Sequence, residues 1–437
     1  MRKIYFLLLL VSPSILADLR VTADTSYRGP DRSMLTLSVP LQFAVNERMQ
    51  KNVDFWLRIY SQYFSYQGLV HDAKYVNHIY EVINFQESPE KPATLVKRSK
   101  QKWKTLLLSV HQKQKTPEKM NADEKVLFDS FADIDEPNKF LNAAHRKRLR
   151  LQQGQRDRFL EGLYQSGTFL PHMEALFKQA NLPIELTRLP FVESSFNLRA
   201  RSKVGASGIW QFMRSTAKLF ITVNDAVDER NDPIRATEAA VKLLRLNYES
   251  LQNWPLAVTA YNHGRTGMMK AVRKVGSDDL SDLVLGYRSR SFGFASSNFF
   301  TELLAAIEIE QNVDKYFGKI ERAKSLEFVE VKLPDFIELK TLLDGTHLDF
   351  EGVKELNPGL TEAVYTGRLL VPANYILRMP KAAHVESATL VQAFWDQYRL
   401  ISDSDKLRSQ RAVKYAKKGK SSKHPKTRRE LQRSSVP

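Results

Sequence analysis

From residue 155 to residue 315 the chain consists of helical segments that end at Gly or Pro. "RDRFLEGLYQSGTFLPHMEALFKQANLP" alternates helix-forming residues with such stops, and "NFFTELLAAIEIEQNV" is strongly helical. Asp232 is suited to cap a helix that starts at Pro233. The pattern predicts an all-α domain with at most one small hairpin, at "GASGIWQF".

The flanking regions complete a mainly α fold. Residues 18–140 are predicted to be a helical N-terminal region, because apolar positions recur with helical spacing from Val53 to Phe64 and "YVNHIYEVINF" indicates a second helix. Basic helical sequence follows around Lys97 to Lys115. Residues 325–380 predict a small α+β module: a strand in "SLEFVEVKL", a short helix in "DFEGVKELNPG" and a strand pair in "GRLLVPANYILRMP". One more helix is predicted in "SATLVQAFWDQYRLI".

The N-terminus has the order of a secretory signal. Arg2 and Lys3 supply the charge, Ile4 to Val11 the apolar core, and cleavage is expected after Ala17. Residues 1–17 therefore predict a signal peptide and an exported protein. The alternative is a buried N-terminal helix. No later stretch of 18 apolar residues occurs, so we expect no transmembrane anchor in the mature chain.

The chain has no cysteine and nine scattered histidines. Disulfides, thiolate metal sites and a Cys-linked lipid anchor are therefore excluded. The histidines show no ligand spacing such as H-x-x-x-H. We expect neither a metal nor a cofactor.

The positive charge is concentrated in the C-terminal tail, residues 400–437. Lys406 to Arg433 contain twelve Lys or Arg and one acid, Glu430, in a chain of net charge +17. An export signal argues against nucleic acid, so the expected partner is an anionic surface of the cell envelope. The alternative is that the tail is solvated and disordered and binds nothing.

Glu193 is a lone carboxylate in an apolar run. It lies in "RLPFVESSFNLRARSKVGASGIWQF", and the next acid is Asp225. Apolar neighbours favour the protonated form, and a protonated Glu can donate to a leaving glycosidic oxygen. Ordinary glycosidases need a second carboxylate, and residues 194–224 offer none. If Glu193 acts on a sugar, a group of the substrate would have to replace the second carboxylate. The alternative is a solvated Glu near a helix end.

Three motifs in order give Glu193 its context. "VESSFN", "SKVGASGIWQF" and "AVTAYNHG" resemble, in order and spacing, the motifs of lytic transglycosylases with a goose-type lysozyme-like domain. The resemblance is closest to the membrane-bound lytic murein transglycosylase D-like family and covers about Gln155 to Gln311. It implies a lysozyme-like catalytic domain over residues 141–320, peptidoglycan glycan strands as substrate, and a periplasmic location.

The resemblance also implies roles for single residues. Glu193 matches the catalytic acid/base. Residues matching the substrate groove are Ser194, Gly205, Ser207, Gln211, Tyr261 and Asn262. The simpler interpretations are a helix end for "YNHG" and a core position for Trp210. Ala295 and Ser296 stand where many relatives have Glu-Thr, so the contact of that glutamate is not carried over.

Two further implications concern the C-terminal module and the reaction. "FEGVKELNPGL" and "GRLLVPANYILRMP" resemble a degenerate LysM module, which implies binding of N-acetylglucosamine chains; the alternative is a structural appendage. The family's reaction cleaves the bond between N-acetylmuramic acid and N-acetylglucosamine and closes a 1,6-anhydro ring without water. The alternatives are a hydrolytic muramidase, with Asp225 or Asp228 as a base distant in sequence, and an inert wall-binding scaffold.

Overall fold

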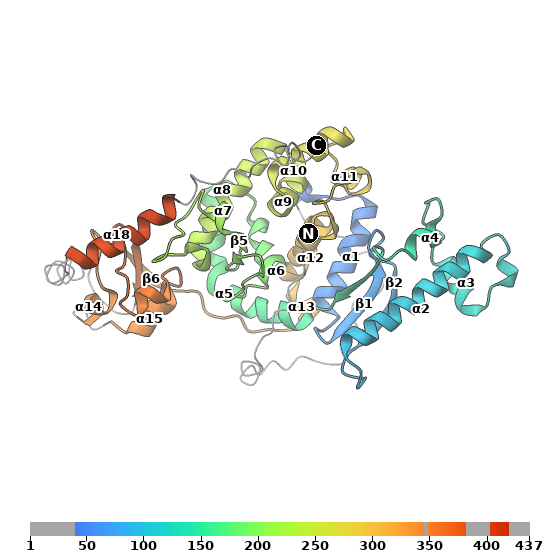
Figure 1. Cartoon of the computed structure of the whole chain (residues 1–437), viewed down its shortest axis with the longest axis horizontal. Coiled ribbons are helices and arrows are strands. Elements are labelled where there is room, and N and C mark those ends of the chain that lie inside the picture. Colours follow the sequence, from blue (N-terminus) through green and yellow to red (C-terminus); the bar gives the residue numbers. More distant parts are fainter. Residues whose placement is uncertain (1–39, 345–347, 382–402, 419–437) are drawn as a thin grey trace, which may run out of the picture. The chain divides into compact units, whose positions relative to one another are not determined.

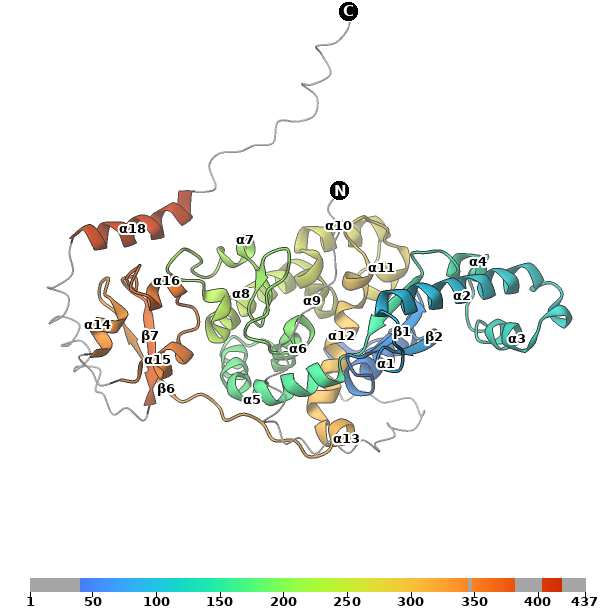
Figure 2. The same cartoon turned by 60° about the horizontal axis from the view of Figure 1, so that its bottom comes forward.

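The computed structural model describes residues 40–344, 348–381 and 403–418. It is mainly α, as predicted (Figures 1 and 2). Within these residues the chain divides into two compact units: unit 1 runs to Ala200 and resumes over Ala240–Ser325, and unit 2 combines Arg201–Ala239 with the residues from Leu326 onward. The predicted domain bounds stay a prediction. The predicted signal sequence, the predicted helix in 387–401 and the tail beyond residue 418 lie outside the described residues.

Unit 1 contains most of the helices. Two predicted helices are confirmed. The periodic segment that starts at Val53 lies in α1, whose N-cap is Asn46, and "NFFTELLAAIEIEQNV" lies mostly in α12. The helices are α1 (Glu47–Ser61), α2 (Pro92–Lys113), α3 (Ala122–Asp129), α4 (Lys139–Ala143), α5 (Arg156–Gln179), α6 (Leu189–Ser194), α9 (Trp254–His263), α10 (Arg265–Val275), α11 (Leu280–Gly286), α12 (Phe294–Gln311) and α13 (Val313–Phe317), with 3₁₀ turns η2 (Leu41–Phe43), η3 (Pro117–Lys119) and η4 (Ile184–Arg188).

Unit 1 also contains a three-stranded antiparallel sheet that the sequence interpretation missed. Its order is β2 (Ile79–Asn84), β1 (Gln67–Asp72) and β3 (Leu149–Gln153). The helix predicted in "YVNHIYEVINF" is therefore wrong. This segment is rich in β-branched and aromatic residues, which suit a pleated surface, and it pairs with a central strand whose residues 68–72 are buried.

Helix α12 is the central helix of unit 1. In both views it lies between α1 and α6, and it packs against α1, α6 and α9 (Figures 1 and 2). Most of its residues from Asn298 to Glu310 are buried, as expected of a helix that is apolar on all sides. Its buried acids near the C-terminal end are paired: Glu308 with Lys315, and Glu310 with Arg188.

Unit 2 joins the predicted hairpin to the C-terminal module. The hairpin is confirmed as β4 (Ala206–Ser207) and β5 (Phe212–Met213). Asp232 caps α8 as predicted: its Oδ1 accepts from the backbone N–H groups of Ile234 and Arg235, at 3.0 and 3.1 Å. The other elements are α7 (Arg214–Ala217), η5 (Glu229–Asn231), α8 (Pro233–Leu251, which continues into unit 1), β6 (Phe328–Lys332), α14 (Leu339–Asp344), α15 (Phe350–Leu356), α16 (Glu362–Tyr365), β7 (Ile376–Pro380) and α18 (Asp403–Lys418).

The C-terminal module differs from its prediction in one respect. The strand in "SLEFVEVKL" and the short helix are confirmed as β6 and α15. "GRLLVPANYILRMP" supplies one strand, β7, which pairs with β6, while Val371 makes an isolated bridge to Ile337. The predicted strand pair is therefore wrong. Pro372 has no N–H to extend a ladder, and Asn374 has a φ of 65°, so the chain turns here.

The two parts of unit 2 share a core. Ala226 and Val227 are buried in one apolar cluster with residues of the module. Arg378 Nη1 lies 2.7 Å from Asp232 Oδ2, and both side chains are almost fully buried. Helix α18, within the predicted tail, joins the module through Ser409 Oγ, which accepts a hydrogen bond from the Leu370 N–H at 3.1 Å.

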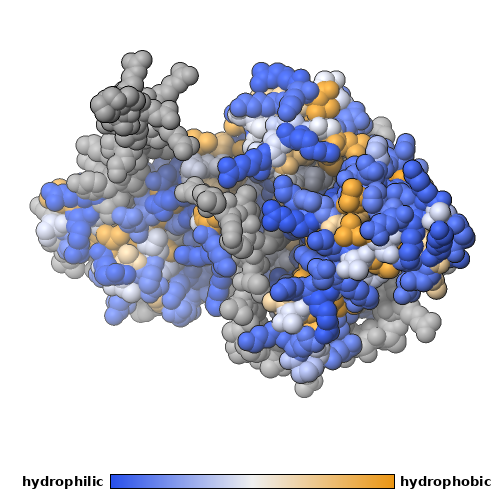
Figure 3. All heavy atoms as spheres, turned by 45° about the vertical axis from the view of Figure 1, so that its right-hand side comes forward, coloured by the Kyte–Doolittle hydropathy of each residue, from blue (hydrophilic) through white to orange (hydrophobic). Residues whose placement is uncertain are grey.

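The face in Figure 3 is mostly hydrophilic, with apolar residues in small separate groups. Exposed large apolar side chains include Val126, Val204 and Leu219, which are distant in sequence. Single exposed apolar residues of this kind are normal and require no partner.

Candidate active site

Glu193 lies in the last turn of α6, just before a sharp backbone turn. Ser195 and Phe196, which follow, both have left-handed backbones, with φ of 52° and 56°. Such angles are unfavourable for residues with a side chain, and they persist where packing enforces them. Phe196 is fully buried, and its ring centroid lies 4.6 Å from that of Phe191. The turn therefore fixes the direction in which the chain leaves Glu193.

Helix α5 supports the same turn from behind. Gly162 of α5 lies close to this turn: a Cβ atom at position 162 would be 2.8 Å from the Ser195 carbonyl oxygen. The ring of Phe159, one turn earlier, stacks on Phe191 with centroids 4.7 Å apart. A glycine at 162 lets α5 approach, so the position of α6 depends on close packing.

The carboxyl group of Glu193 is held in its protonated form. Burial raises its pKa to about 8, from an ordinary value of 4.5, while the side chain remains partly exposed. This agrees with the apolar sequence around it. A carboxylic acid that is protonated at neutral pH and accessible to solvent can act as a general acid.

Tyr261 of α9 is brought next to Glu193. Burial raises its pKa well above the usual value, and the charge of Glu193 raises it further. Its ring lies parallel to that of Phe299, with centroids 6.3 Å apart. Asn262, the next residue, is exposed, and its Oδ1 accepts a hydrogen bond from Ser296 Oγ at 2.8 Å. Of the predicted Tyr-Asn pair, the tyrosine thus interacts electrostatically with Glu193, and the asparagine is held by α12.

Ser194 is buried, and its hydroxyl makes a hydrogen bond within α6. Ser194 Oγ donates to the Pro190 carbonyl at 3.3 Å, within the same helix. This bond supports the helix that carries Glu193.

The hairpin residues belong to unit 2. Gly208 has a φ of 77°, and a Cβ atom there would lie 1.7 Å from the Arg230 carbonyl oxygen, whereas Gly205, with a φ of 92°, faces open space. Ser207 Oγ donates to Asn231 Oδ1 at 2.6 Å. Gln211 has a φ of 47°, and its Nε2 donates to the Gly208 carbonyl at 2.8 Å.

Trp210 is a core residue, as its simpler interpretation predicts. It is fully buried, and its Nε1 donates to Thr237 Oγ1 at 2.9 Å.

The acids named for a hydrolytic alternative have structural contacts. Asp228 Oδ2 lies 2.7 Å from Arg230 Nη2, in an ion pair that is mostly buried. Asp225 is exposed, and its backbone carbonyl accepts from Thr361 Oγ1 at 2.7 Å. Asp228 thus caps η5, and Asp225 lies in a loop.

Sequence reasoning missed three residues of this site: Glu302 of α12, Tyr60 of α1 and Arg150 of β3. Burial and the charge of Glu193 raise the pKa of Glu302 to about 8, against the opposing effect of Arg150. The pKa of Tyr60 is raised well above its usual value by burial, and further by the charges of both glutamates. The signal was available, because Glu302 is the only acid between Asp282 and Glu308 and lies in an apolar helix.

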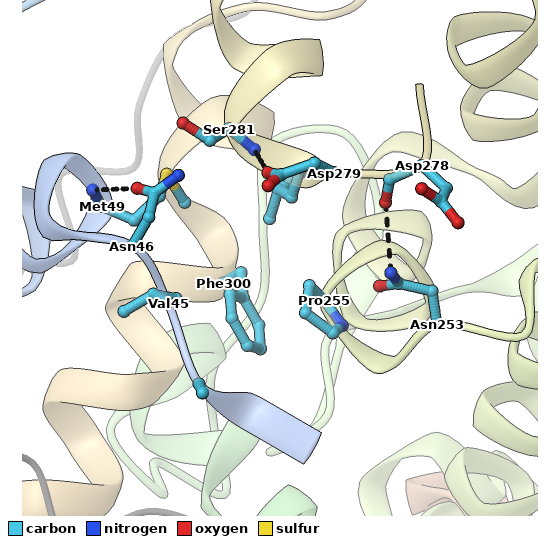
Figure 4. A pocket seen from close by; sticks show the side chains of 11 residues that line it. Val45, Asn46, Met49, Asn253, Pro255, Asp278, Asp279, Ser281 and Phe300 are labelled. Atoms are coloured by element: carbon cyan, nitrogen blue, oxygen red, sulfur yellow. Dashed lines mark hydrogen bonds between the residues drawn. The ribbon is translucent and has the colours of Figure 1, made fainter. Parts of the chain in front are cut away.

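A separate cavity of about 270 Å³ in unit 1 contains none of the predicted site residues. Figure 4 shows Asn46, Asn253 and Asp279 around it. Their polar atoms are engaged in the chain's own hydrogen bonds: Asn46 accepts from the Met49 N–H at 3.0 Å, and Asp279 from the Ser281 N–H at 2.6 Å. These are helix caps, and they explain the polar lining without a ligand.

The described ranges contain no group of three or more His, Asp or Glu that could hold a metal ion. In the same part of the chain, none of the helices has the length and apolar character needed to span a bilayer.

Comparison with known proteins agrees with the geometry around Glu193. Residues 172–284 match the Transglycosylase SLT domain family. The chain is 30% identical over 190 residues to Membrane-bound lytic murein transglycosylase D of Escherichia coli K12, and equally to the protein of that name from Escherichia coli O6:H1 strain CFT073. Each match covers 42% of this chain and 40% of the relative.

The chain thus matches less than half the length of these curated relatives. The matched region contains Glu193, the hairpin and Tyr261. Residues 172–284 thus match the Transglycosylase SLT domain family, and the chain is similar to the membrane-bound lytic murein transglycosylases D, as its three motifs predicted.

Proposed function

We propose that the protein is a peptidoglycan lytic transglycosylase, which cleaves the β-1,4 bond between N-acetylmuramic acid and N-acetylglucosamine without water and leaves 1,6-anhydromuramic ends. One observation carries the proposal: Glu193, in a region of the Transglycosylase SLT domain family, has its pKa raised to about 8 by burial. The reaction needs one group that gives a proton and then takes one back, and such a carboxyl can do both.

The proposed reaction uses Glu193 twice. Its protonated carboxyl donates to the glycosidic oxygen as the bond to C1 of the muramoyl residue breaks. The acetamido group of the substrate stabilises the positive charge at C1. The carboxylate of Glu193 then removes the proton of the C6 hydroxyl, whose oxygen bonds to C1. Glu193 ends protonated, so the cycle is complete and the products together contain no added water.

Tyr261 supports the first half of this cycle. A tyrosine whose pKa is raised stays neutral and can donate a hydrogen bond to a carboxylate, which favours the ionised Glu193 that forms after proton transfer. By the resemblance, the residues that contact the glycan are Ser194, Gly205, Ser207, Gln211, Tyr261 and Asn262. These contacts are part of the proposal.

Mass analysis of murein digestion products tests the reaction. A transglycosylase gives fragments that are one water lighter than hydrolytic fragments and that borohydride does not reduce. Mainly reducing ends would overturn the proposal. Glu193→Gln, incubated in parallel, should release neither kind of fragment and excludes a contaminating enzyme.

A hydrolytic muramidase is a second candidate because of Glu302. Hydrolases of this bond need a second carboxylate, and Glu302 interacts electrostatically with Glu193. The product analysis separates the two reactions. An inert scaffold, the third interpretation, predicts no products of either kind.

The location and the surface partner of the protein are also proposed. A signal sequence at residues 1–17 would deliver the chain to the periplasm, where murein lies. Lys406 to Arg433 would hold it on an anionic envelope surface. Deleting residues 419–437, which follow α18, should weaken retention on isolated envelopes and reduce its sensitivity to salt. Equal retention at all salt concentrations would leave the tail as a solvated segment.

The C-terminal module is proposed to be LysM-like and to bind N-acetylglucosamine chains. Two antiparallel strands, β6 and β7, enclose the helices α14, α15 and α16 in sequence, which supports the resemblance. Binding of chitin oligomers to the protein with Glu193→Gln, followed by the signals of residues 326–381, tests this. Unperturbed signals would make the module a structural appendage.

A further inference from the structure

Glu302 faces α1 from the middle of α12. One turn earlier on α12, Asn298 Oδ1 accepts a hydrogen bond from Trp56 Nε1 of α1 at 3.3 Å. Residues four apart lie on the same helix face, so Glu302 follows Asn298 on the side that faces α1, and Tyr60 follows Trp56. The charge of Glu302 raises the pKa of the buried Tyr60, so the two side chains lie near each other.

Tyr60 connects this side of α12 to α6. Its ring stacks on that of Phe159 with centroids 5.1 Å apart, and Phe159 stacks in turn on Phe191 at 4.7 Å. Phe191 is two residues before Glu193. Helix α6 also packs directly against α12. The two glutamates thus come from adjacent helices and approach the same buried tyrosine.

The charges around the two carboxyls differ. Arg150 favours the ionised form of Glu302, whereas burial raises the pKa of Glu193. The guanidinium of Arg150 lies 3.9 Å from the ring centre of Phe294, at the start of α12. The remaining titratable neighbours are Tyr60 and Tyr261, which are neutral at any pH near 7.

Two other cations near α12 form ion pairs with acids other than Glu193 and Glu302. Arg188 of η4 pairs with Glu310, and Lys315 of α13 pairs with Glu308. Both acids lie at least six residues beyond Glu302 on the helix. Arg150 is therefore the cation that distinguishes the two carboxyls.

We propose that Glu302 is a positioning residue for the catalytic proton: of the two carboxyls, Glu302 ionises first as the pH rises, and its charge then keeps the remaining proton on Glu193. Two like charges in one poorly solvated site do not both form readily, so one carboxyl ionises first. Arg150 makes Glu302 that carboxyl. The resulting anion then holds the proton on Glu193, the residue that has to donate it.

The pKa of about 8 for Glu302 includes repulsion from an ionised Glu193. With Glu193 neutral this repulsion is absent, so Glu302 loses its proton at lower pH. Ionised Glu302 in turn opposes ionisation of Glu193, whose carboxyl is already kept protonated by burial.

A titration that needs no substrate tests the placement of the proton. In protein labelled with ¹³C at the glutamate carboxyl, Glu302→Asp and Glu193→Gln identify the two signals. In the wild-type protein Glu302 should titrate at lower pH than Glu193. In Glu302→Gln the midpoint of Glu193 should move to lower pH by at least about one unit, the usual effect of losing a nearby like charge. The opposite order of titration, or an unmoved Glu193 midpoint, would overturn the proposal.

The pH dependence of activity is a second measurement, and it rests on the proposed function. Glu302→Gln should keep the anhydro products but lose activity at lower pH than the wild type, by about one unit, or about tenfold at a fixed alkaline pH. Glu302→Asp, which keeps the charge, should restore the profile. If the wild type gives reducing ends and Glu302→Gln is inactive at every pH, Glu302 is a water-activating base and the proposal is wrong. Because the titration is independent of turnover, an inactive protein would overturn the proposed function and leave this test intact.

Discussion

Ser296 Oγ donates a hydrogen bond to Asn262 Oδ1 over 2.8 Å, which links α12 to the end of α9. Ser296 stands where many relatives have the threonine of a Glu-Thr pair, and the structure gives its hydroxyl a role independent of the missing glutamate. The bond holds the exposed amide of Asn262 next in sequence to Tyr261, whose pKa is affected by the charge of Glu193. The position of a predicted glycan contact thus depends on a buried serine.

Removing this hydroxyl should impair turnover without unfolding the protein. Ser296→Ala loses one hydrogen bond, worth about 0.5–1.5 kcal/mol, so we expect kcat/KM on murein to fall by about two- to tenfold. Ser296→Thr should retain activity. Ser297→Ala is the matched control, because the Ser297 hydroxyl donates to the Phe294 carbonyl of its own helix. An equal loss in both alanine variants would mean a general effect on α12.

Glu193→Gln should abolish activity and keep the fold. The amide has the shape of the acid but can neither give nor take the proton, so murein release should fall by at least about 10²-fold, the usual contribution of a general acid/base. Circular dichroism should be unchanged. A folded Gln variant with near wild-type release would remove Glu193 from the mechanism.

The same variant should change how stability depends on pH. Because the folded-state pKa of Glu193 is raised from 4.5 to about 8, its proton stabilises the folded state fully below pH 4.5, and this contribution is lost as pH rises to about 8. Gln has no proton to lose. At pH 9 Glu193→Gln should therefore be more stable to urea than wild type, by at least about 1.4 kcal/mol, the equivalent of one pKa unit. At pH 4 the difference that titration causes should be absent; a constant difference at all pH values would contradict the raised pKa.

How much of the site could be read from the sequence depended on distance along the chain. The apolar neighbours of Glu193 are local, so its raised pKa was predictable. Glu302 lies 109 positions further on, and its link to Glu193 exists only because α6 and α12 pack together. The same criterion, one acid in an apolar helix, would have singled it out, but no sequence rule says which two lone acids meet.

The fold shows the same division between local and tertiary signals. Helices α1, α8 and α12 were predictable because their periodicity or caps lie within one segment. Strand β2 was assigned to a helix, because a short apolar run such as "HIYEVINF" fits either structure until its partner is known. That partner, β1, pairs on its other side with β3, whose residues lie 77 to 85 positions further along the chain, and this pairing made the segment a strand.

Arg188 should be a major determinant of the stability of unit 1. Its Nε and Nη2 contact Glu310 Oε2 at 2.8 and 2.6 Å, and both residues are mostly buried. Arg188→Ala removes the more buried of the two arginines that pair with Glu310. It should lower the free energy of unfolding by about 3–5 kcal/mol. Arg322→Ala is the control, because Arg322 contacts the same carboxylate but is more exposed, and it should cost about 1 kcal/mol or less. Urea unfolding measures both; equal losses would contradict the difference in burial.

Replacing each of the two hairpin glycines, Gly205 and Gly208, by alanine separates the cost of backbone conformation from the cost of steric overlap. Both have left-handed backbones, so replacing either by alanine should cost about 1–2 kcal/mol from the backbone alone. A Cβ atom at Gly205 meets open space, whereas one at Gly208 would lie 1.7 Å from the Arg230 carbonyl oxygen. Arg230 cannot yield freely, because its Nη1 donates to the Gly205 and Phe212 carbonyls at 2.8 and 3.2 Å and thereby ties the hairpin together. Gly208→Ala should therefore cost at least about 4 kcal/mol, the range of severe steric changes, and Gly205→Ala only the backbone share. Urea unfolding of the two variants gives both values, and similar losses would mean that the hairpin relaxes around residue 208.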